Sequence, residues 1–157
     1  CSLSEEIELI RQYAVIQKAR FMNFEIEFDL EESSLGCRVF QFFLQPVVEN
    51  AIVHGFQRGM TRGGRIEIQS RIFEHTLCIT VTDNGCGFDV EEWERADEPQ
   101  ENHTNIGLRC IRQILQLEYG PEYGMTIQSN PGRGTTVTYR LPAESGGDGD
   151  DSRTDCG

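Results

Sequence analysis

The chain has 157 residues, of which 38% are hydrophobic, and this is enough for one globular domain with its own core. Its 26 acidic residues outnumber its 14 basic residues and give a net charge of −12, which argues against nucleic acid as the main partner. No apolar run approaches the roughly 18 residues that a membrane-spanning helix needs, and the polar, acidic start does not resemble a signal peptide. Because Cys1 is not a natural first residue, we expect an excised piece of a longer protein.

The first predicted element is a helix that ends near Arg20. Ser2 and Glu5 have the spacing of a capping box, in which each side chain satisfies a free amide at the start of a helix. Residues 24–30 alternate between apolar and acidic side chains and therefore predict a half-buried strand, followed by a loop over residues 31–36.

A longer helix is predicted over residues 39–56. Its apolar stripe would face the core and comprises Leu44, Val47, Val48, Ala51 and Ile52. The other side carries Glu49, Asn50, Val53, His54 and Gln57. An amide oxygen there suits Mg²⁺, and a carboxylate can accept a proton, although an ordinary solvated face has the same composition. Because Pro46 lies inside the span, the helix either begins near Gln45 or begins near residue 39 and kinks.

The remaining elements alternate between strands and helices. Residues 65–73 and 77–82 predict an antiparallel hairpin, and residues 90–96 predict a short helix. A loop at 105–107 would lead into a helix that Gly120 and Pro121 end. Residues 125–129 and 135–141 predict two further strands.

Two glycine-containing stretches could approach a ligand closely. Asp83 ends the second strand of the hairpin, and the glycines at 85 and 87 permit a sharp turn there, although Asp-Asn-Gly is also an ordinary turn sequence. Gly107 precedes a helix whose free amides could bind phosphate. Arg109 and Arg112 add positive charge nearby, but a surface role suits them equally well.

Six cysteines lie at positions 1, 37, 78, 86, 110 and 156 and form no Cys-x-x-Cys pair. We interpret them as reduced thiols of a cytosolic protein. The histidines at 54, 75 and 103 lack the spacing of a zinc site.

Four motifs in order resemble the N, G1, G2 and G3 boxes of the GHKL ATP-binding superfamily. They are Glu49-Asn50, Asp-Asn-Gly-Cys-Gly at 83–87, Asn-Ile-Gly-Leu at 105–108 and Gly-Arg-Gly-Thr at 132–135. Residues 44–55 also follow the Leu-Gln-Pro-(Leu/Val)-Val-Glu-Asn-Ala-Ile-x-His-Gly core of sensor histidine kinases in the branch of the autolysin and sugar-uptake sensors. The resemblance covers residues 3–142. One glycine box alone is a weak signal, whereas four in order with this long match are a strong one.

The resemblance implies the Bergerat fold, an α/β (α+β) two-layer sandwich. A mixed, largely antiparallel sheet of about five strands would have three helices on one face. The helix over residues 39–56 would be long and kinked at Pro46. Residues 1–22 would be the end of a helix from the dimerisation region, residues 23–142 the ATP-binding catalytic domain, and residues 143–157 a disordered acidic tail. Residues 88–104 would include a lid that is mobile until ATP orders it.

The resemblance also implies a function and a site. The domain would transfer the γ-phosphoryl group of ATP to a histidine in an upstream dimerisation segment that this chain lacks. Glu49 would be catalytic, by polarising that histidine or a water, and Asn50 would bind Mg²⁺. The predicted nucleotide-binding residues are Asn50, His54, Asp83, Gly85, Gly87, Gly107, Leu108 and Thr135. Asp83 would accept a hydrogen bond from the exocyclic amine of adenine, and the Thr135 hydroxyl would help to hold the base.

The implied partners are the dimerisation segment of its own homodimer and a response regulator. The implied location is the cytoplasmic side of a membrane-anchored bacterial protein. Three departures weaken the phosphate site: Asn105 and Cys110 stand where the family has glycine and asparagine, and Val53 where many relatives have lysine. Two alternatives remain: a protein serine kinase or ATPase of the same fold, and a non-enzymatic interaction module. Nucleotide binding would distinguish the non-enzymatic interaction module from the histidine kinase and from the serine kinase or ATPase.

Overall fold

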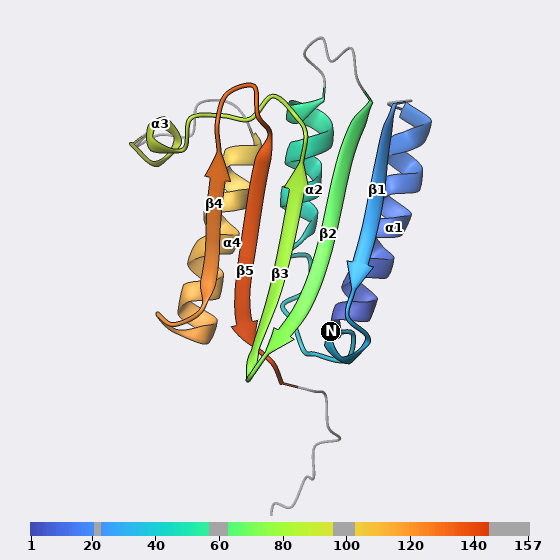
Figure 1. Cartoon of the computed structure of the whole chain (residues 1–157). Helices are drawn as coiled ribbons and strands as arrows, with labels where there is room; N and C mark the ends of the chain where they lie inside the picture. The colour runs from blue at the N-terminus through green and yellow to red at the C-terminus, as the bar shows by residue number, and fades with distance from the viewer. Residues whose placement is uncertain (21–22, 57–62, 96–102, 145–157) are drawn as a thin grey trace, which may run out of the picture.

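The structure of the protein, a computed structural model, describes residues 1–20, 23–56, 63–95 and 103–144. A five-stranded sheet forms one layer, with the strands in the order β1-β2-β3-β5-β4 (Figure 1). These strands are β1 (Phe24–Leu30), β2 (Gly64–Phe73), β3 (Thr76–Asp83), β4 (Gly124–Ser129) and β5 (Thr135–Pro142). Only β1 and β2 pair in parallel, and the other three pairs are antiparallel. The prediction of a mixed, largely antiparallel sheet is confirmed.

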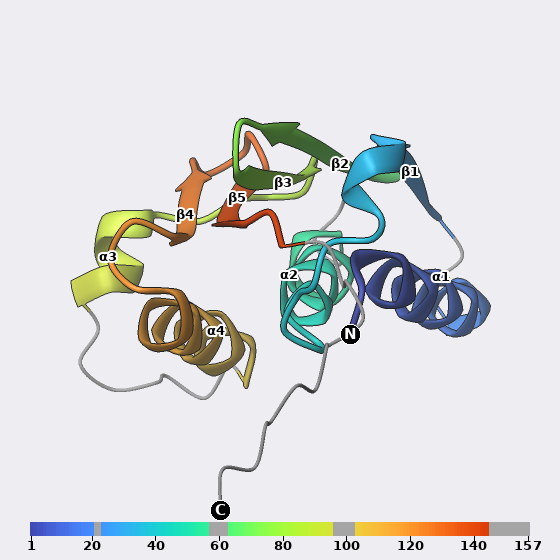
Figure 2. The ribbon, with the colours of Figure 1, turned by 90° about the horizontal axis from the view of Figure 1, so that it is seen from below.

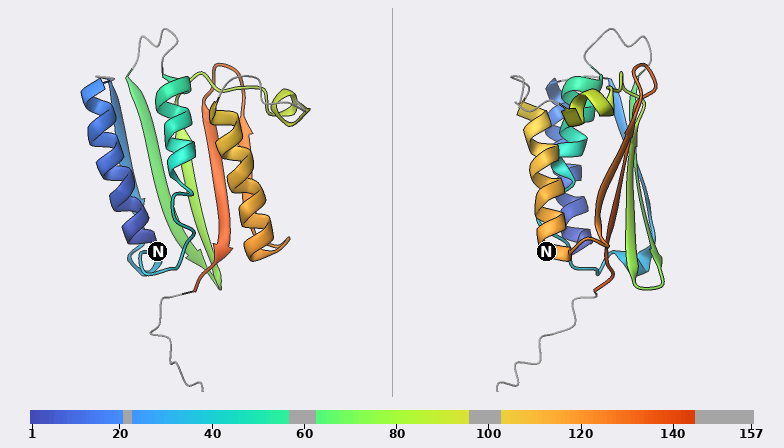
Figure 3. Two further views of the ribbon diagram at one scale, coloured as in Figure 1. Left: turned by 180° about the vertical axis from the view of Figure 1, so that it is seen from behind. Right: turned by 90° about the vertical axis from the view of Figure 1, so that its left-hand side faces the viewer.

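Three helices cover one face of this sheet (Figures 2 and 3). They are α1 (Leu3–Arg20), α2 (Gln45–Glu49) with its π-helical continuation η2 (Asn50–Gly55), and α4 (His103–Tyr119). The short helix α3 (Val90–Arg95) lies beyond the edge strand β4, and a 3₁₀ turn, η1 (Glu32–Ser34), follows β1. The predicted two-layer sandwich is therefore confirmed.

The core lies between these two layers. In β3, Leu77, Ile79 and Val81 are buried, while Thr80 and Thr82 lie on the opposite, more open face of the sheet. This is the period of two expected for a sheet with one covered face. Helix α1 contributes Leu3, Ile7, Ile10 and Ala14 to the same core.

The predicted capping box at the start of α1 is present. The Ser2 amide donates to the Glu5 carboxylate at 2.7 Å, and the Glu5 amide donates to the Ser2 hydroxyl at 3.2 Å. Two of the amides that lack partners within the helix are thereby satisfied.

The predicted long, kinked helix over residues 39–56 is wrong. The helix begins at Gln45, and Phe42 just before it has a φ of 63°, which no helical residue adopts. Pro46 therefore lies in the first turn, where its missing amide hydrogen would have had no partner anyway. The predicted loop at 105–107 is also wrong, because α4 already begins at His103.

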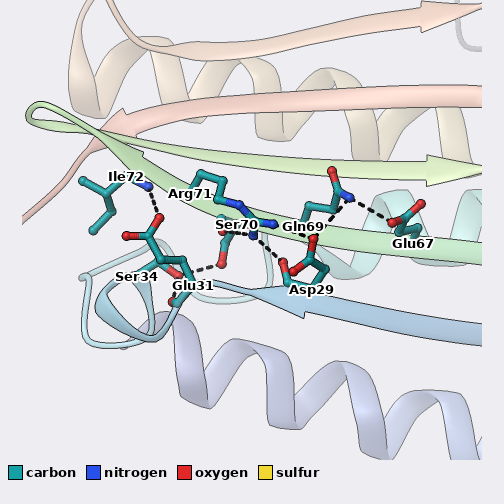
Figure 4. A network of polar contacts seen from close by, with 8 residues as sticks. All are labelled: Asp29, Glu31, Ser34, Glu67, Gln69, Ser70, Arg71 and Ile72. Atoms are coloured by element: carbon teal, nitrogen blue, oxygen red, sulfur yellow. Dashed lines mark hydrogen bonds and ion pairs between the residues drawn. The ribbon is translucent and has the colours of Figure 1, made fainter.

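Polar contacts fix the end of the parallel pair of strands next to η1 (Figure 4). The buried hydroxyls of Ser34 and Ser70 lie 2.6 Å apart, and the Ser34 hydroxyl also donates to the carbonyl of Glu31 at 2.6 Å. Arg71 and Asp29 form an ion pair at 2.5 Å, but both side chains are about half exposed, so the pair contributes little stability. The ion pair joins β2 to β1, whereas the buried hydroxyl pair joins β2 to the turn after β1.

None of the helices within the described ranges has the length and apolar character needed to cross a membrane. The predicted lid and the predicted acidic tail fall largely on residues 96–102 and 145–157, which lie outside the described residues.

Candidate nucleotide-binding site

Three of the four sequence motifs meet at one end of the sheet. The loop after β3, residues 84–87, contacts the end of η2 and the turn between β4 and β5 (Figure 1). The Cys86 amide donates to the Gly55 carbonyl at 3.0 Å, and the Gly132 amide donates to the Cys86 carbonyl at 2.6 Å. Backbone hydrogen bonds therefore join the loop after β3 to residues that lie 31 positions before Cys86 (86 − 55) and 46 positions after it (132 − 86).

Asp83 is the last residue of β3 and is only 7% exposed. One of its carboxylate oxygens accepts a hydrogen bond from the Gly85 amide at 2.8 Å. Burial raises the pKa of Asp83 to about 6, although hydrogen bonds from the backbone amides of Gly85 and Thr135 act in the opposite direction. A buried carboxylate held by backbone amides has a fixed direction, as a residue that recognises a polar ligand needs.

Gly85 permits the loop to pack directly on the end of η2. A Cβ at this position would lie 2.8 Å from the Cα of Gly55 and 2.8 Å from the Asp83 carboxylate, so a side chain would push both away. Gly55 was not among the predicted site residues. Gly87 has a φ of 62°, and a Cβ there would come even closer to the carbonyl oxygen of Asn130.

Thr135 pairs with Asp83 in the register of β3 and β5 and is 4% exposed. Its hydroxyl lies 2.8 Å from the hydroxyl of Ser129, which also accepts the Phe88 amide at 2.9 Å. Ser129 thus supports both Thr135 and the chain after the glycine loop. Ser129 was not among the predicted site residues, although the hairpin register, in which Ser129 is the partner of Thr135, points to it.

The predicted polar face of the second helix is divided between two kinds of helix. Glu49 is exposed at the end of α2, half-buried Asn50 begins η2, and His54 is exposed near the end of η2. Burial and then the Glu49 carboxylate raise the pKa of Tyr13 in α1 to about 12. Pi-helical turns are rare and occur often at functional sites, and no feature of the sequence predicts this one.

Gly107 and Leu108 lie inside α4, not at its first residue. A Cβ on Gly107 would lie 3.3 Å from the Cβ of Pro46, so this glycine lets α4 approach α2 closely. Leu108 is 1% exposed and belongs to the core. Both residues therefore have a packing role, and their predicted contact with nucleotide stays a prediction.

Helix α3 is held against α4 by Arg109 and Arg112. Arg109 donates to the Trp93 carbonyl, and its guanidinium carbon lies 5.1 Å from the centre of the Trp93 ring. Arg112 forms an ion pair with Glu94 at 2.9 Å. The Trp93 indole NH is buried and has no hydrogen-bond partner among the described residues.

The donor set is consistent with Mg²⁺ bound mainly through phosphate oxygens. Within the described part of the chain, no three His, Cys, Asp or Glu side chains gather into a metal site. Mg²⁺ is commonly held by one or two protein oxygens together with substrate phosphates and water. Asn50 and Glu49, which are adjacent in the sequence, have an amide oxygen and a carboxylate of this kind.

Comparison with known proteins agrees with this geometry. Residues 38–145 match the family described as histidine kinase-, DNA gyrase B-, and HSP90-like ATPase. The chain is 32% identical over 145 residues to the sensor histidine kinase YesM of Bacillus subtilis, and 31% identical over 146 residues to the sensor histidine kinase BtsS of Escherichia coli. These alignments cover 92% and 90% of this chain but only 24% of each relative, so the chain spans about a quarter of their length.

The fold is also similar to that of solved histidine kinases. The Acinetobacter baumannii histidine kinase AdeS superposes with a TM-score of 0.65 at 15% sequence identity, over 92% of this chain and 66% of the solved chain. At this identity the likeness establishes the fold alone. The family match covers more than half of the chain and includes Glu49, Asn50, Asp83 and Thr135. The chain belongs to the family of histidine kinase-, DNA gyrase B- and HSP90-like ATPases.

Proposed function

We propose that this chain is the ATP-binding catalytic domain of a two-component sensor histidine kinase. The observation that carries the proposal is the buried Asp83 carboxylate, held by the Gly85 amide at the point where the motifs meet. The sensor kinases among the relatives support the class of reaction.

In this proposal Asp83 selects adenine. Its carboxylate would accept a hydrogen bond from the exocyclic amine of the base, with Thr135 and Ser129 supporting the neighbouring strand. Guanine has an oxygen at the corresponding position and cannot donate to Asp83. A buried acceptor left without its donor costs free energy, so the site would reject guanine nucleotides.

The phosphates would lie toward α2 and η2. Asn50 would hold Mg²⁺, which would supply neutralisation of phosphate charge. Glu49 would orient the accepting imidazole and accept its proton, and as an exposed residue at the end of α2 it is open to a group presented by another segment. His54, Gly87, Gly107 and Leu108 complete the proposed nucleotide-binding set.

The whole protein would be larger than this chain. The accepting histidine would lie in a dimerisation segment of a homodimer, and the phosphoryl group would pass to a response regulator. Residues 1–22 would connect that segment to the catalytic domain at 23–142. The domain would be the cytoplasmic part of a membrane-anchored bacterial protein.

Calorimetric titration of this chain tests the proposal. We expect saturable binding of ATP in the presence of Mg²⁺ and binding of GTP at least about 10-fold weaker, because an unpaired buried acceptor costs about 1–3 kcal/mol. Folded protein that binds neither nucleotide, or that binds both equally, would contradict the assignment of Asp83 to the adenine site.

A second prediction separates binding from chemistry. In the full-length kinase, Glu49→Gln should lower the rate of autophosphorylation at saturating ATP by about 100-fold or more, the usual contribution of a positioned acid or base. The dissociation constant for ATP should change only a few-fold, since Glu49 acts on the acceptor. Both the rate of autophosphorylation and the dissociation constant for ATP would be measured on the same preparation of each protein, the variant and the wild type. An unchanged rate of autophosphorylation would show that Glu49 is not the catalytic residue.

A further inference from the structure

The chain enters α2 through a short, unusual segment. Residues 42–44 precede the helix, and Phe42 has a φ of 63°, a conformation that costs energy for an aromatic residue. Leu44 is the N-cap of α2 and has no side-chain acceptor of its own for the first amides of the helix. Other elements must therefore hold this segment in place.

Helix α1 supplies one of these contacts through Glu6. The Glu6 side chain is 1% exposed, and its two carboxylate oxygens accept the amides of Phe42 at 2.9 Å and Leu44 at 3.1 Å. Hydrogen bonds to an ionised acceptor are stronger than neutral ones, and a negative charge is favourable at the start of a helix. Glu6 thus fixes the position at which α2 begins.

The sheet supplies a second contact to the same segment. Tyr139 of β5 is fully buried, and its hydroxyl donates to the carbonyl of Phe43 at 3.0 Å. Its ring meets the Phe43 ring edge-on, with 4.9 Å between the centres. The segment is therefore bound on one side by α1 and on the other by β5.

Helix α1 lies next to α2 in the helix layer (Figures 2 and 3). Tyr13 lies seven residues after Glu6, about two turns along the same side of α1. Burial and then the Glu49 carboxylate raise the pKa of Tyr13. The direct link between α1 and the start of α2 is the pair of hydrogen bonds that Glu6 accepts.

We propose that Glu6 is a positioning residue that couples α1 to the nucleotide site. By fixing the first residue of α2, its carboxylate sets the position of Glu49 and Asn50 at the far end, about 8 Å away. A displacement of α1 would then displace both residues, and nucleotide bound at Asn50 would affect α1 in return. This inference rests on the proposed function, because it assigns a role relative to nucleotide.

Nuclear magnetic resonance of the amide groups tests the coupling. Helix α1 begins at the end of the molecule opposite to the loop at 84–87 (Figure 1), so direct contact with nucleotide cannot affect residues 3–10. We expect the Mg²⁺ complex of a non-hydrolysable ATP analogue to shift the signals of residues 84–87 and also those of residues 3–10. In Glu6→Gln, whose amide nitrogen must face a backbone amide donor, the shifts at 3–10 should be lost while those at 84–87 remain.

Tyr139→Phe is the matched control. It removes the other side-chain hydrogen bond to the segment but leaves Glu6 intact, so it should lower thermal stability and keep the shifts at 3–10. If Glu6→Gln does not fold, Glu6→Asp, whose carboxylate is one methylene shorter, replaces it with the same expected loss. Equal shifts at 3–10 in the wild type and the folded Glu6 variant, or none there in the wild type, would overturn the coupling. Absence of shifts at 84–87 in the wild type would instead contradict the proposed function.

Discussion

Replacing Asp83 with asparagine is expected to weaken ATP binding by about 10- to 100-fold, the effect of losing a hydrogen bond to a charged acceptor. One carboxylate oxygen already accepts the Gly85 amide, so the single oxygen of an asparagine can serve either Gly85 or adenine. The side-chain amide nitrogen of the asparagine would then face the other of these two groups, which is also a hydrogen-bond donor. Calorimetric titration of both proteins at pH 7.5 would measure the change.

The same substitution should increase stability above pH 6. The pKa of Asp83 is about 6 in the folded protein, against an ordinary value of 3.8. As the pH rises from about 4 to 6, the unfolded chain loses a proton that the folded chain retains, so the free energy of unfolding falls, by up to about 3 kcal/mol. Above pH 6 the Asp83 carboxylate is ionised in the folded protein, so the full free-energy cost of burying its charge is present. Asparagine has no charge and avoids this cost.

Urea denaturation at several pH values would test this expectation. The Asp83→Asn variant should be more stable than the wild type at pH 8, and its advantage should disappear near pH 4. Glu25→Gln, which neutralises an exposed carboxylate on β1, is the control and should show no such dependence. If the variant is less stable than the wild type at pH 8, the hydrogen bonds to the Asp83 carboxylate contribute more free energy than burial of its charge costs, and the expectation is wrong.

Replacing Gly134 with alanine is expected to cost about 3 kcal/mol or more, a large part of the stability of a domain of this size. Its φ is 81°, and a Cβ there would lie 2.1 Å from the carbonyl oxygen of Asp83. That oxygen belongs to a strand paired with β5, so the backbone would have to move. The adenine site should be lost along with the stability.

Gly132 provides a matched control in the same turn. It has a φ of 79°, but no atom lies within 4 Å of the position that its Cβ would take. Gly132→Ala should therefore cost only the conformational strain, about 1–2 kcal/mol. Chemical denaturation of the two variants would give the difference. Equal losses would mean that the contact with Asp83 is relieved by a small shift of the turn.

The sequence predicted the sheet well because its signals are local. The alternation at Leu77, Ile79 and Val81 requires only that one face be buried, and β3 follows it. The start of α2 depends instead on Glu6, which is 38 positions away from Leu44. Such a contact leaves no periodic pattern, and resemblance to a longer helix led to the wrong boundary.

Only the part of the candidate site that lies in local sequence motifs was predicted. Asp83 and Gly85 stand in one short motif, and the structure places them in direct contact. The approach of Gly85 to Gly55 and the bond between Thr135 and Ser129 depend on tertiary packing, so the sequence did not reveal them. Gly107 was singled out for an approach to phosphate, which stays a prediction, and the sequence did not reveal its close approach to Pro46.

The contact between α3 and α4 gives this protein a built-in optical probe. Trp93 is the only tryptophan in the chain, and its ring lies buried beside the Arg109 guanidinium. Tryptophan fluorescence therefore arises from one place, the segment that leads into the predicted lid. Separation of α3 from α4 would expose the indole to water and move its emission to longer wavelength. Stopped-flow mixing with nucleotide could thus time this step without an attached dye.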